Sequence, residues 1–289
     1  MTYDLAIGDR GYSSWSLRGW LLLDAFGLPY RTHFARLYTD ELPKLLADFA
    51  PARTVPALKA PDGTVIPDSL AMAEELASRH PDAGLWPAEP RLRAAARTLA
   101  AEMHSSFMAL RDACSMNLRA AFTGFQPSER VLADIARIEA LWAWARGLSG
   151  SKTPWLFGAY SAADAFYAPV AARIATYGLP VGPEAQAYVA AHLAHPSFRR
   201  WRAMGLVDGP DQPAYALPLA TRPWPGPAPL AAEAVAKGPS ENAACPYSGK
   251  PVTHFLKLDG RVWGFCNAFC RDKTVADPAA WPAFTALLG

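Results

Sequence analysis

Three of the four cysteines of this 289-residue chain stand close together near its end, and their spacing suits metal binding. Cys266 and Cys270 in "GFCNAFC" are one helical turn apart, and Cys245 lies upstream in "CPYSGK". Thiolates suit zinc, or Cu(I), and a metal would stabilise a segment too small to bury much core. A four-ligand zinc site needs one more donor, for which His254 is the candidate and water or a partner residue the alternatives. A metal-free module, with these cysteines in a core or a disulfide, is the other interpretation.

A second group of candidates, Ser13 and Ser14 in "GYSSWSLRGW", stands between an expected buried strand and a helix. The unpaired N–H groups of a helix N-terminus, together with a hydroxyl, can stabilise an anion there. The simpler interpretation is that one serine only caps the helix.

Two further segments could hold a peptide-like ligand. In "RTVPAL" a cis Val55-Pro56 bond would turn the Val55 backbone groups outward to pair with an extended ligand. In "PDSLAMAEEL" Asp68 suits an ammonium group, while Ser69 and the helix N-terminus suit a carboxylate. The alternatives are a strand-entry proline and a helix cap.

The elements that would position these residues fall into four parts. Residues 1–82 predict the order strand, helix, strand, helix, hairpin, helix, and 88–207 predict helices only. Residues 208–240 are proline-rich and predict an extended connector, and 241–289 predict a small module with a hairpin turning at Asp259-Gly260 and a short helix. The helices expected in the second part cover 91–114, 128–148, 161–178, 183–194 and 196–204.

The expected helix 91–114 presents a face that could line a second-substrate pocket. An apolar floor with Arg111 as its polar handle would suit a small electrophile, whereas core packing or a dimer contact is the alternative. The candidate residues are Met103, His104, Phe107, Met108, Arg111, Met116 and Asn117.

Composition narrows the class of protein. The net charge is +2 and 51% of residues are hydrophobic, which gives no reason to expect nucleic-acid or membrane binding. The N-terminal residues lack the pattern of a secretory signal, and the cysteine usage is not that of a disulfide scaffold, so we expect a cytoplasmic protein.

Taken in order, these segments resemble the glutathione transferase family, and in particular its serine-type, zeta-like bacterial group, over about residues 3–207. The resemblance implies an α/β thioredoxin-like domain at 1–82, an all-α domain at 88–207, and a homodimer. The segments that carry it are "YSSWSLRGWLLL", "VPAL", "DSLAMAEEL", "AEMHSSFMALRDACSMNLRA" and "YSAADAFYAPVAARI".

The resemblance also implies roles for single residues. Ser13 takes the place of the catalytic serine, with Ser14 as the fallback. Val55 would pair with the cysteinyl part of glutathione, and Asp68 and Ser69 would hold its γ-glutamyl end. Thr54 stands where the family often has a basic residue, which leaves open the contact to the glycyl carboxylate. The residues expected to bind glutathione are Ser13, Arg53, Thr54, Val55, Pro56, Asp68 and Ser69.

At the other end, residues 243–275 resemble the TRASH-type treble-clef module, with Ser248 where a second cysteine is common. This resemblance implies a small α+β metal-binding module, of a family linked to metal sensing and handling.

The function expected from both resemblances is a glutathione S-transferase that activates glutathione as a thiolate for attack on a small hydrophobic electrophile. The alternatives are a glutathione-dependent isomerase or peroxidase of the same fold, or a metal-binding or sensing protein that uses this fold as a scaffold.

Overall fold

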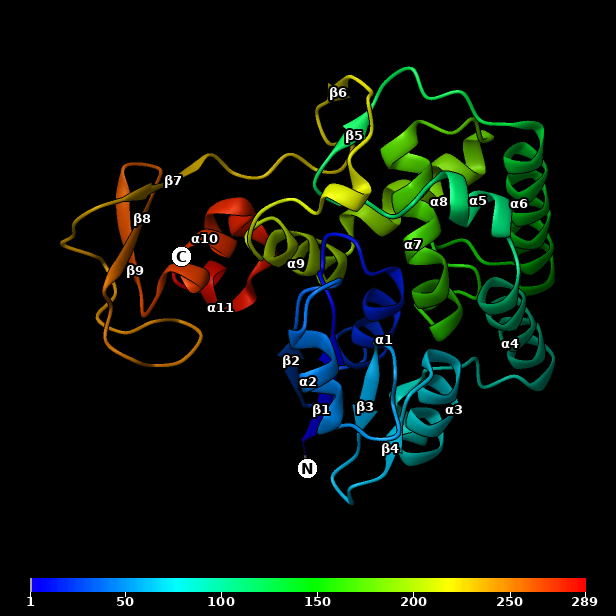
Figure 1. Cartoon of the computed structure of the whole chain (residues 1–289), viewed down its shortest axis with the longest axis horizontal. Helices are drawn as coiled ribbons and strands as arrows, with labels where there is room; N and C mark the ends of the chain where they lie inside the picture. The colour runs from blue at the N-terminus through cyan, green and yellow to red at the C-terminus, as the bar shows by residue number, and fades with distance from the viewer. Residues whose placement is uncertain (1) are drawn as a thin grey trace.

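The computed structural model describes residues 2–289, and its N-terminal part is an α/β domain. One mixed sheet has the strand order β2-β1-β3-β4, with β1 parallel to β2 and antiparallel to β3 (Figure 1). Along the chain the elements follow the predicted order of strand, helix, strand, helix, hairpin and helix. Its elements are β1 (Tyr3–Ile7), α1 (Ser14–Asp24), β2 (Tyr30–Phe34), α2 (Glu41–Ala47), β3 (Ala57–Lys59), β4 (Val65–Ile66) and α3 (Ser69–Arg79), followed by a 3-10 turn at Pro81–Ala83.

Both faces of β1 are covered, which explains its nearly continuous apolar sequence. Leu5 and Ile7 belong to the main core cluster with α1, whereas Ala6 packs in a smaller cluster with Leu46 of α2. Helices α1 and α2 therefore lie on opposite faces of the sheet. Gly19 allows α1 to approach the loop before β3, since a Cβ there would lie 2.9 Å from Pro56.

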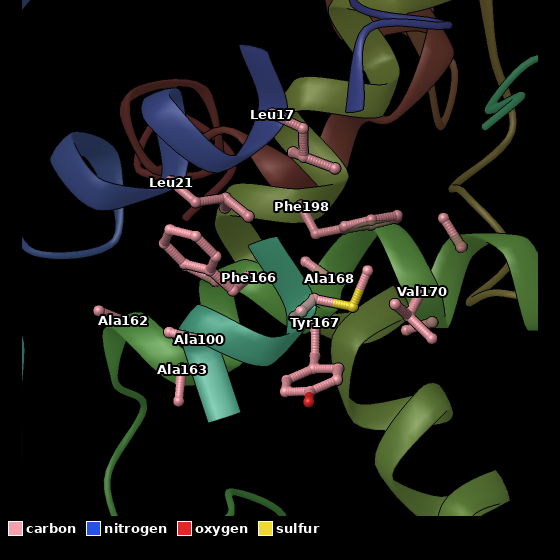
Figure 2. Packing of buried hydrophobic residues seen from close by; sticks show 14 of the residues in the cluster. Leu17, Leu21, Ala100, Ala162, Ala163, Phe166, Tyr167, Ala168, Val170 and Phe198 are labelled. Carbon is pink, nitrogen blue, oxygen red and sulfur yellow. The ribbon is translucent and has the colours of Figure 1, made fainter. Parts of the chain in front are cut away.

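The middle part of the chain is helical, and every residue of α7 is buried. Leu17 and Leu21 of α1 and Phe198 of α9 lie around Phe166 of α7, so this helix joins the two domains (Figure 2). Ser161 and Asp164 form a capping box at the start of this helix. The helices are α4 (Pro90–Ser105), α5 (Met108–Ala113), α6 (Glu129–Ser149), α7 (Ala162–Tyr177), α8 (Pro183–Ala194) and α9 (Pro196–Gly205). Within residues 2–289, none of them is both long and apolar enough to cross a membrane.

The single helix expected over 91–114 is wrong, because the chain breaks between α4 and α5 at Phe107, whose φ is 63°. Arg111 reaches back and donates hydrogen bonds to the carbonyl oxygens of Ser106 and Met103. It thereby satisfies acceptors that the end of α4 leaves without helical partners. The common face inferred from regular helical spacing across this break does not exist.

Residues 208–240 contain short strands that pair with the helical domain on one side and with the C-terminal module on the other. Strand β6 (Thr221–Arg222) pairs with β5 (Ala121–Phe122), and Arg222 donates to the carbonyl oxygen of Ala175 on α7. A 3-10 turn covers Pro213–Tyr215. Strand β7 (Ala232–Val235) pairs with a strand of the C-terminal module, so this stretch is not an extended connector throughout.

The C-terminal module holds a three-stranded sheet in the order β7-β8-β9 and packs on α9 (Figure 1). Arg199 of α9 forms a two-pronged ion pair with Asp277, at 2.8 and 2.6 Å, and Ala203 of α9 joins the module's apolar cluster. The module therefore has packing support besides its cysteines. Its elements are β8 (His254–Leu258), β9 (Arg261–Phe265), α10 (Ala268–Ala276), a 3-10 turn at Pro278–Ala280 and α11 (Pro282–Thr285).

Candidate active site and cysteine cluster

A cavity of about 560 Å³ lies between the α/β domain and the helical domain. Its walls come from the β1–α1 loop, the segment before Pro56, helix α5 and the residues after it, helix α7, and the 3-10 turn of the connector. The lining residues are Tyr12, Ser13, Ser14, Trp15, Leu37, Leu42, Arg53, Thr54, Val55, Met108, Arg111, Asp112, Ser115, Met116, Arg173 and Tyr215.

Ser13 is the N-cap of α1 and lines this cavity. Its Oγ accepts a bond from the Ser16 backbone N–H at 3.3 Å and donates to the Ser16 Oγ at 2.8 Å. Ser13 therefore caps the helix, as the simpler interpretation predicted, and a capping hydroxyl lies at the positive end of the helix dipole.

Ser14 faces a different partner. Its Oγ accepts a hydrogen bond from Arg173 of α7 at 3.4 Å, and the side chain is buried. The two serines therefore have different surroundings: Ser13 caps the N-terminus of α1, whereas Ser14 contacts α7.

The segment before β3 has the geometry expected of it. The Val55-Pro56 bond is cis, as the sequence suggested, and Val55 lines the cavity with Arg53 and Thr54. Within residues 2–289, the Val55 backbone N–H and C=O form no hydrogen bond, so both are free to pair with a ligand. Pro56 is buried against α1 and does not line the cavity.

Asp68 and Ser69 lie outside the cavity lining. Asp68 caps α3, accepting from the backbone N–H groups of Leu70 and Ala71 through Oδ1, while Oδ2 lies 3.3 Å from His104 Nε2. Ser69 is fully buried, and its Oγ has no hydrogen-bond partner among the described residues.

The break at Phe107 divides the residues expected to form the second-substrate pocket. Met108, Arg111 and Met116 line the cavity. Met103 and Phe107 are core residues instead, and Asn117 lines a neighbouring cavity. His104 approaches Asp68 and is likewise absent from the lining.

Sequence reasoning missed eight lining residues: Tyr12, Trp15, Leu37, Leu42, Asp112, Ser115, Arg173 and Tyr215. Tyr215 comes from the connector, and its ring stacks on Tyr12 with centroids 4.5 Å apart. Gln212 anchors this segment by donating to the Asp9 carboxylate at 3.1 Å. Only the buried Arg173 left a signal in the sequence, because the one other charged residue of its largely apolar helix is the capping Asp164, and a buried charge without a partner calls for an explanation.

The three C-terminal cysteines meet, as their spacing predicted. The Sγ atoms of Cys245, Cys266 and Cys270 all lie within 4.8 Å of one another, and all three are free thiols. His254 is not in this group; its Nδ1 lies 2.9 Å from Thr253 Oγ1. Ser248 Oγ donates to Cys266 Sγ at 3.3 Å.

The surroundings of the cysteine cluster act in opposite directions on two of its thiols: burial raises the pKa of Cys270 to about 12, whereas the pKa of Cys245 is lowered. Although burial opposes it, hydrogen bonds from the backbone N–H groups of Tyr247 and Cys266 lower the pKa of Cys245 to about 7. The ammonium group of Lys273 lies over the rings of Trp281 and Tyr247, at 3.8 and 3.9 Å from their centroids, and interacts electrostatically with the thiols. A buried cation beside three thiols offsets the charge that they gain on ionisation.

The cavity and its serine-bearing helix N-terminus can be compared with known proteins. Residues 12–79 match the family model "Glutathione S-transferase, N-terminal domain". The chain is 32% identical over 136 residues to the probable maleylacetoacetate isomerase of Caenorhabditis elegans, a match that covers 46% of this chain and 62% of that relative.

Solved structures extend the likeness to both domains. A glutathione transferase homologue from Burkholderia with bound glutathione has a TM-score of 0.53 at 24% identity, covering 71% of this chain and 98% of that one. Maleylacetoacetate isomerase from Anaeromyxobacter dehalogenans, with glutathione bound in its active site, has a TM-score of 0.51 at 25% identity, covering 72% and 98%. The fold is that of the glutathione transferases.

Proposed function

We propose that this protein is a glutathione-dependent enzyme whose Ser13 stabilises the glutathione thiolate for attack on a small electrophile. The observation that carries the proposal is the position of Ser13, which lines the interdomain cavity as the N-cap of α1. Val55, with both backbone groups unpaired, would bind the cysteinyl part of glutathione and bring its sulfur to this helix end.

The free energy needed to ionise the glutathione thiol at neutral pH is small. A thiol with a pKa near 9 is mostly protonated at neutral pH, and lowering that value by two units takes about 2.7 kcal/mol. A charge-assisted hydrogen bond from the Ser13 hydroxyl and the dipole of α1 can together supply this energy. For the hydroxyl to donate to sulfur, it must turn away from Ser16, which accepts its proton in this structure.

The reaction after attack is either transfer or isomerisation. The relatives named maleylacetoacetate isomerase favour isomerisation, in which the thiolate adds to a double bond, the adduct rotates and glutathione leaves again. In transfer, the thioether product is kept. Cytoplasmic location and a homodimer remain expectations.

We expect the protein to turn over electrophiles only when glutathione is present, and product analysis separates the two reactions. Incubation with glutathione and a cis-enone should give either the trans isomer with glutathione recovered, or a stable glutathione adduct. Reaction without glutathione, or none with any electrophile of a broad panel, would contradict the proposal.

We further propose that the cysteine cluster is a metal site held by Cys245, Cys266 and Cys270, with zinc as the metal. A tetrahedral zinc–thiolate site with Zn–S bonds of about 2.3 Å has sulfur atoms about 3.8 Å apart. The Cys266 and Cys270 sulfur atoms are 3.9 Å apart, so this pair fits without rearrangement. Because His254 lies outside the cluster, the fourth ligand would come from solvent or a bound molecule.

A further inference from the structure

The side chain of Arg10, in the loop between β1 and α1, lies where the C-terminal module meets the α/β domain. It is buried, and its Nη1 atom donates to the Asp208 carboxylate at 2.6 Å. Its guanidinium group lies 5.2, 5.7 and 5.9 Å from the ring centroids of Phe34, Trp201 and Phe269. These distances are within the range of about 6 Å over which a cation is attracted to an aromatic ring. Since Phe269 belongs to α10, Arg10 connects the module directly to the β1–α1 loop.

The β1–α1 loop is a tight turn that leads from Arg10 to Ser13. The Ser13 backbone N–H donates to the Asp9 carbonyl oxygen at 2.8 Å, which closes the turn. The end of α9 packs closely against it, since a Cβ at Gly205 would lie 3.0 Å from the Gly11 nitrogen. A close-packed turn has little room to absorb a shift of Arg10, so such a shift reaches Ser13.

A second connection runs from the module through α9 to the other end of α1. Arg200 of α9 donates to the Ala280 carbonyl oxygen of the module at 3.4 Å. It also donates to the carboxylate of Asp24, the last residue of α1, at 2.5 Å. The module therefore supports α1 on both sides, through Arg10 before its N-terminus and through Arg200 at its C-terminus.

The part of the module that contacts Arg10 is also the part that the proposed metal would fix. Phe269 stands between Cys266 and Cys270 in the sequence, so a metal bound by both thiolates holds the backbone on either side of it. Asn267 caps α10 at the same point by accepting a hydrogen bond from the Cys270 backbone N–H at 2.8 Å. Phe269 is itself 39% exposed, so the position of its ring depends on the backbone that carries it.

The charge of a bound metal would act in the same direction. The Lys273 ammonium group lies 5.8 Å from the centroid of the Phe269 ring, which Arg10 also approaches, so two cations share one ring. A zinc ion held by three thiolates leaves one net negative charge beside Lys273. This charge offsets the repulsion between the two cations and stabilises the contact between the module and the loop.

We propose that metal binding at the cysteine cluster strengthens glutathione binding in the interdomain cavity, through the contact of Phe269 with Arg10. The inference rests on the proposed function and adds regulation to the same sites. The metal fixes α10, α10 places Phe269 on Arg10, and Arg10 holds the loop that carries Ser13. Coupling between two binding sites is reciprocal, so a ligand in the cavity must raise the affinity of the cluster for its metal by the same factor.

The test is calorimetric titration of the full chain with S-methylglutathione, whose thioether does not compete for the metal as a free thiol would. We expect the zinc-loaded protein to bind this ligand about fivefold more tightly than the chelator-treated protein, at the lower end of allosteric couplings. Titration of zinc in competition with a chromophoric chelator, with and without S-methylglutathione, should give the same factor for zinc.

Phe269→Ala separates the coupling from the metal site. This variant should bind zinc with the wild-type stoichiometry, while zinc changes its affinity for S-methylglutathione by no more than about twofold, because the ring that contacts Arg10 is gone. Phe269→Tyr keeps the ring and should retain the zinc effect. Leu287→Ala truncates an apolar residue of the same module that is exposed to a similar degree, and as the matched control it should behave as wild type.

Three outcomes would overturn the inference. The first is equal affinity of zinc-loaded and zinc-free wild-type protein for S-methylglutathione, with both ligands binding. The second is a zinc effect that Phe269→Ala keeps in full. The third is failure of either ligand to bind the wild-type protein, which would also refute the proposed glutathione site or the proposed metal site, and the two separate titrations show which.

Discussion

Replacement of Ser13 by alanine is expected to raise the pKa of the bound glutathione thiol by one to two units and to lower kcat/KM about 10- to 100-fold at neutral pH. The reason is that each pKa unit is worth about 1.4 kcal/mol, or about a factor of ten in rate, and the dipole of α1 still supplies the rest of the stabilisation. Part of the rate should return at high pH, where the thiol ionises without help. The measurement is the pH profile of kcat/KM, together with the ultraviolet absorbance of the bound thiolate.

Ser14→Ala is the matched comparison, because Ser14 lines the same cavity but accepts its hydrogen bond from Arg173. Its effect on the thiol pKa should be smaller than that of Ser13→Ala. Ser13→Ala also removes the N-cap of α1, at a cost of about 1 kcal/mol, so the thermal midpoint must be measured alongside activity. Equal and small effects of the two variants on the thiol pKa would remove Ser13 from its proposed role.

The second large effect is expected at the cysteine cluster. The purified protein should bind about one zinc per chain, and Cys270→Ser should abolish stoichiometric binding because it removes one of three thiolates. Loss of the metal should also make residues 241–289 more sensitive to protease. The checks are metal analysis by atomic emission and limited proteolysis, with and without a chelator.

Cys114→Ala is the control for the metal prediction. Cys114 is buried between helices, and burial raises its pKa to about 12, so it is unsuited to metal binding. This variant should keep its zinc. Unchanged metal content in Cys270→Ser, or a wild-type protein that binds no thiophilic metal, would refute the site. Unchanged protease resistance after metal loss would instead assign the module's stability to its packing on α9 and to the Arg199–Asp277 pair.

The parts of the fold that could be predicted from sequence are those specified by neighbouring residues. The capping box at Ser161, the hairpin at Asp259-Gly260 and the meeting of Cys266 with Cys270 each depend on a few adjacent positions. The same holds for Ser13, whose role as N-cap follows from its place before an apolar helix.

Other features depend on contacts that no local pattern records. At the break at Phe107, Arg111 satisfies carbonyl groups at the end of α4 through contacts that the sequence pattern, which is compatible with a continuous helix, does not record. Tyr215 enters the cavity only because Gln212 and its neighbours fasten the connector to the β1–α1 loop. Strand β7 was missed because its pairing partner follows it at a distance in the chain.

The central claim, that the interdomain cavity binds glutathione, is tested most directly by calorimetric titration of the full chain with glutathione. We predict one site per chain with an affinity in the micromolar-to-millimolar range. Asp68 lies outside the cavity lining, so weaker binding by Asp68→Asn, which keeps the helix cap, would show that the γ-glutamyl end extends beyond that lining to α3. The absence of detectable binding by wild-type protein would contradict the account and leave the cysteine cluster as the remaining candidate for function.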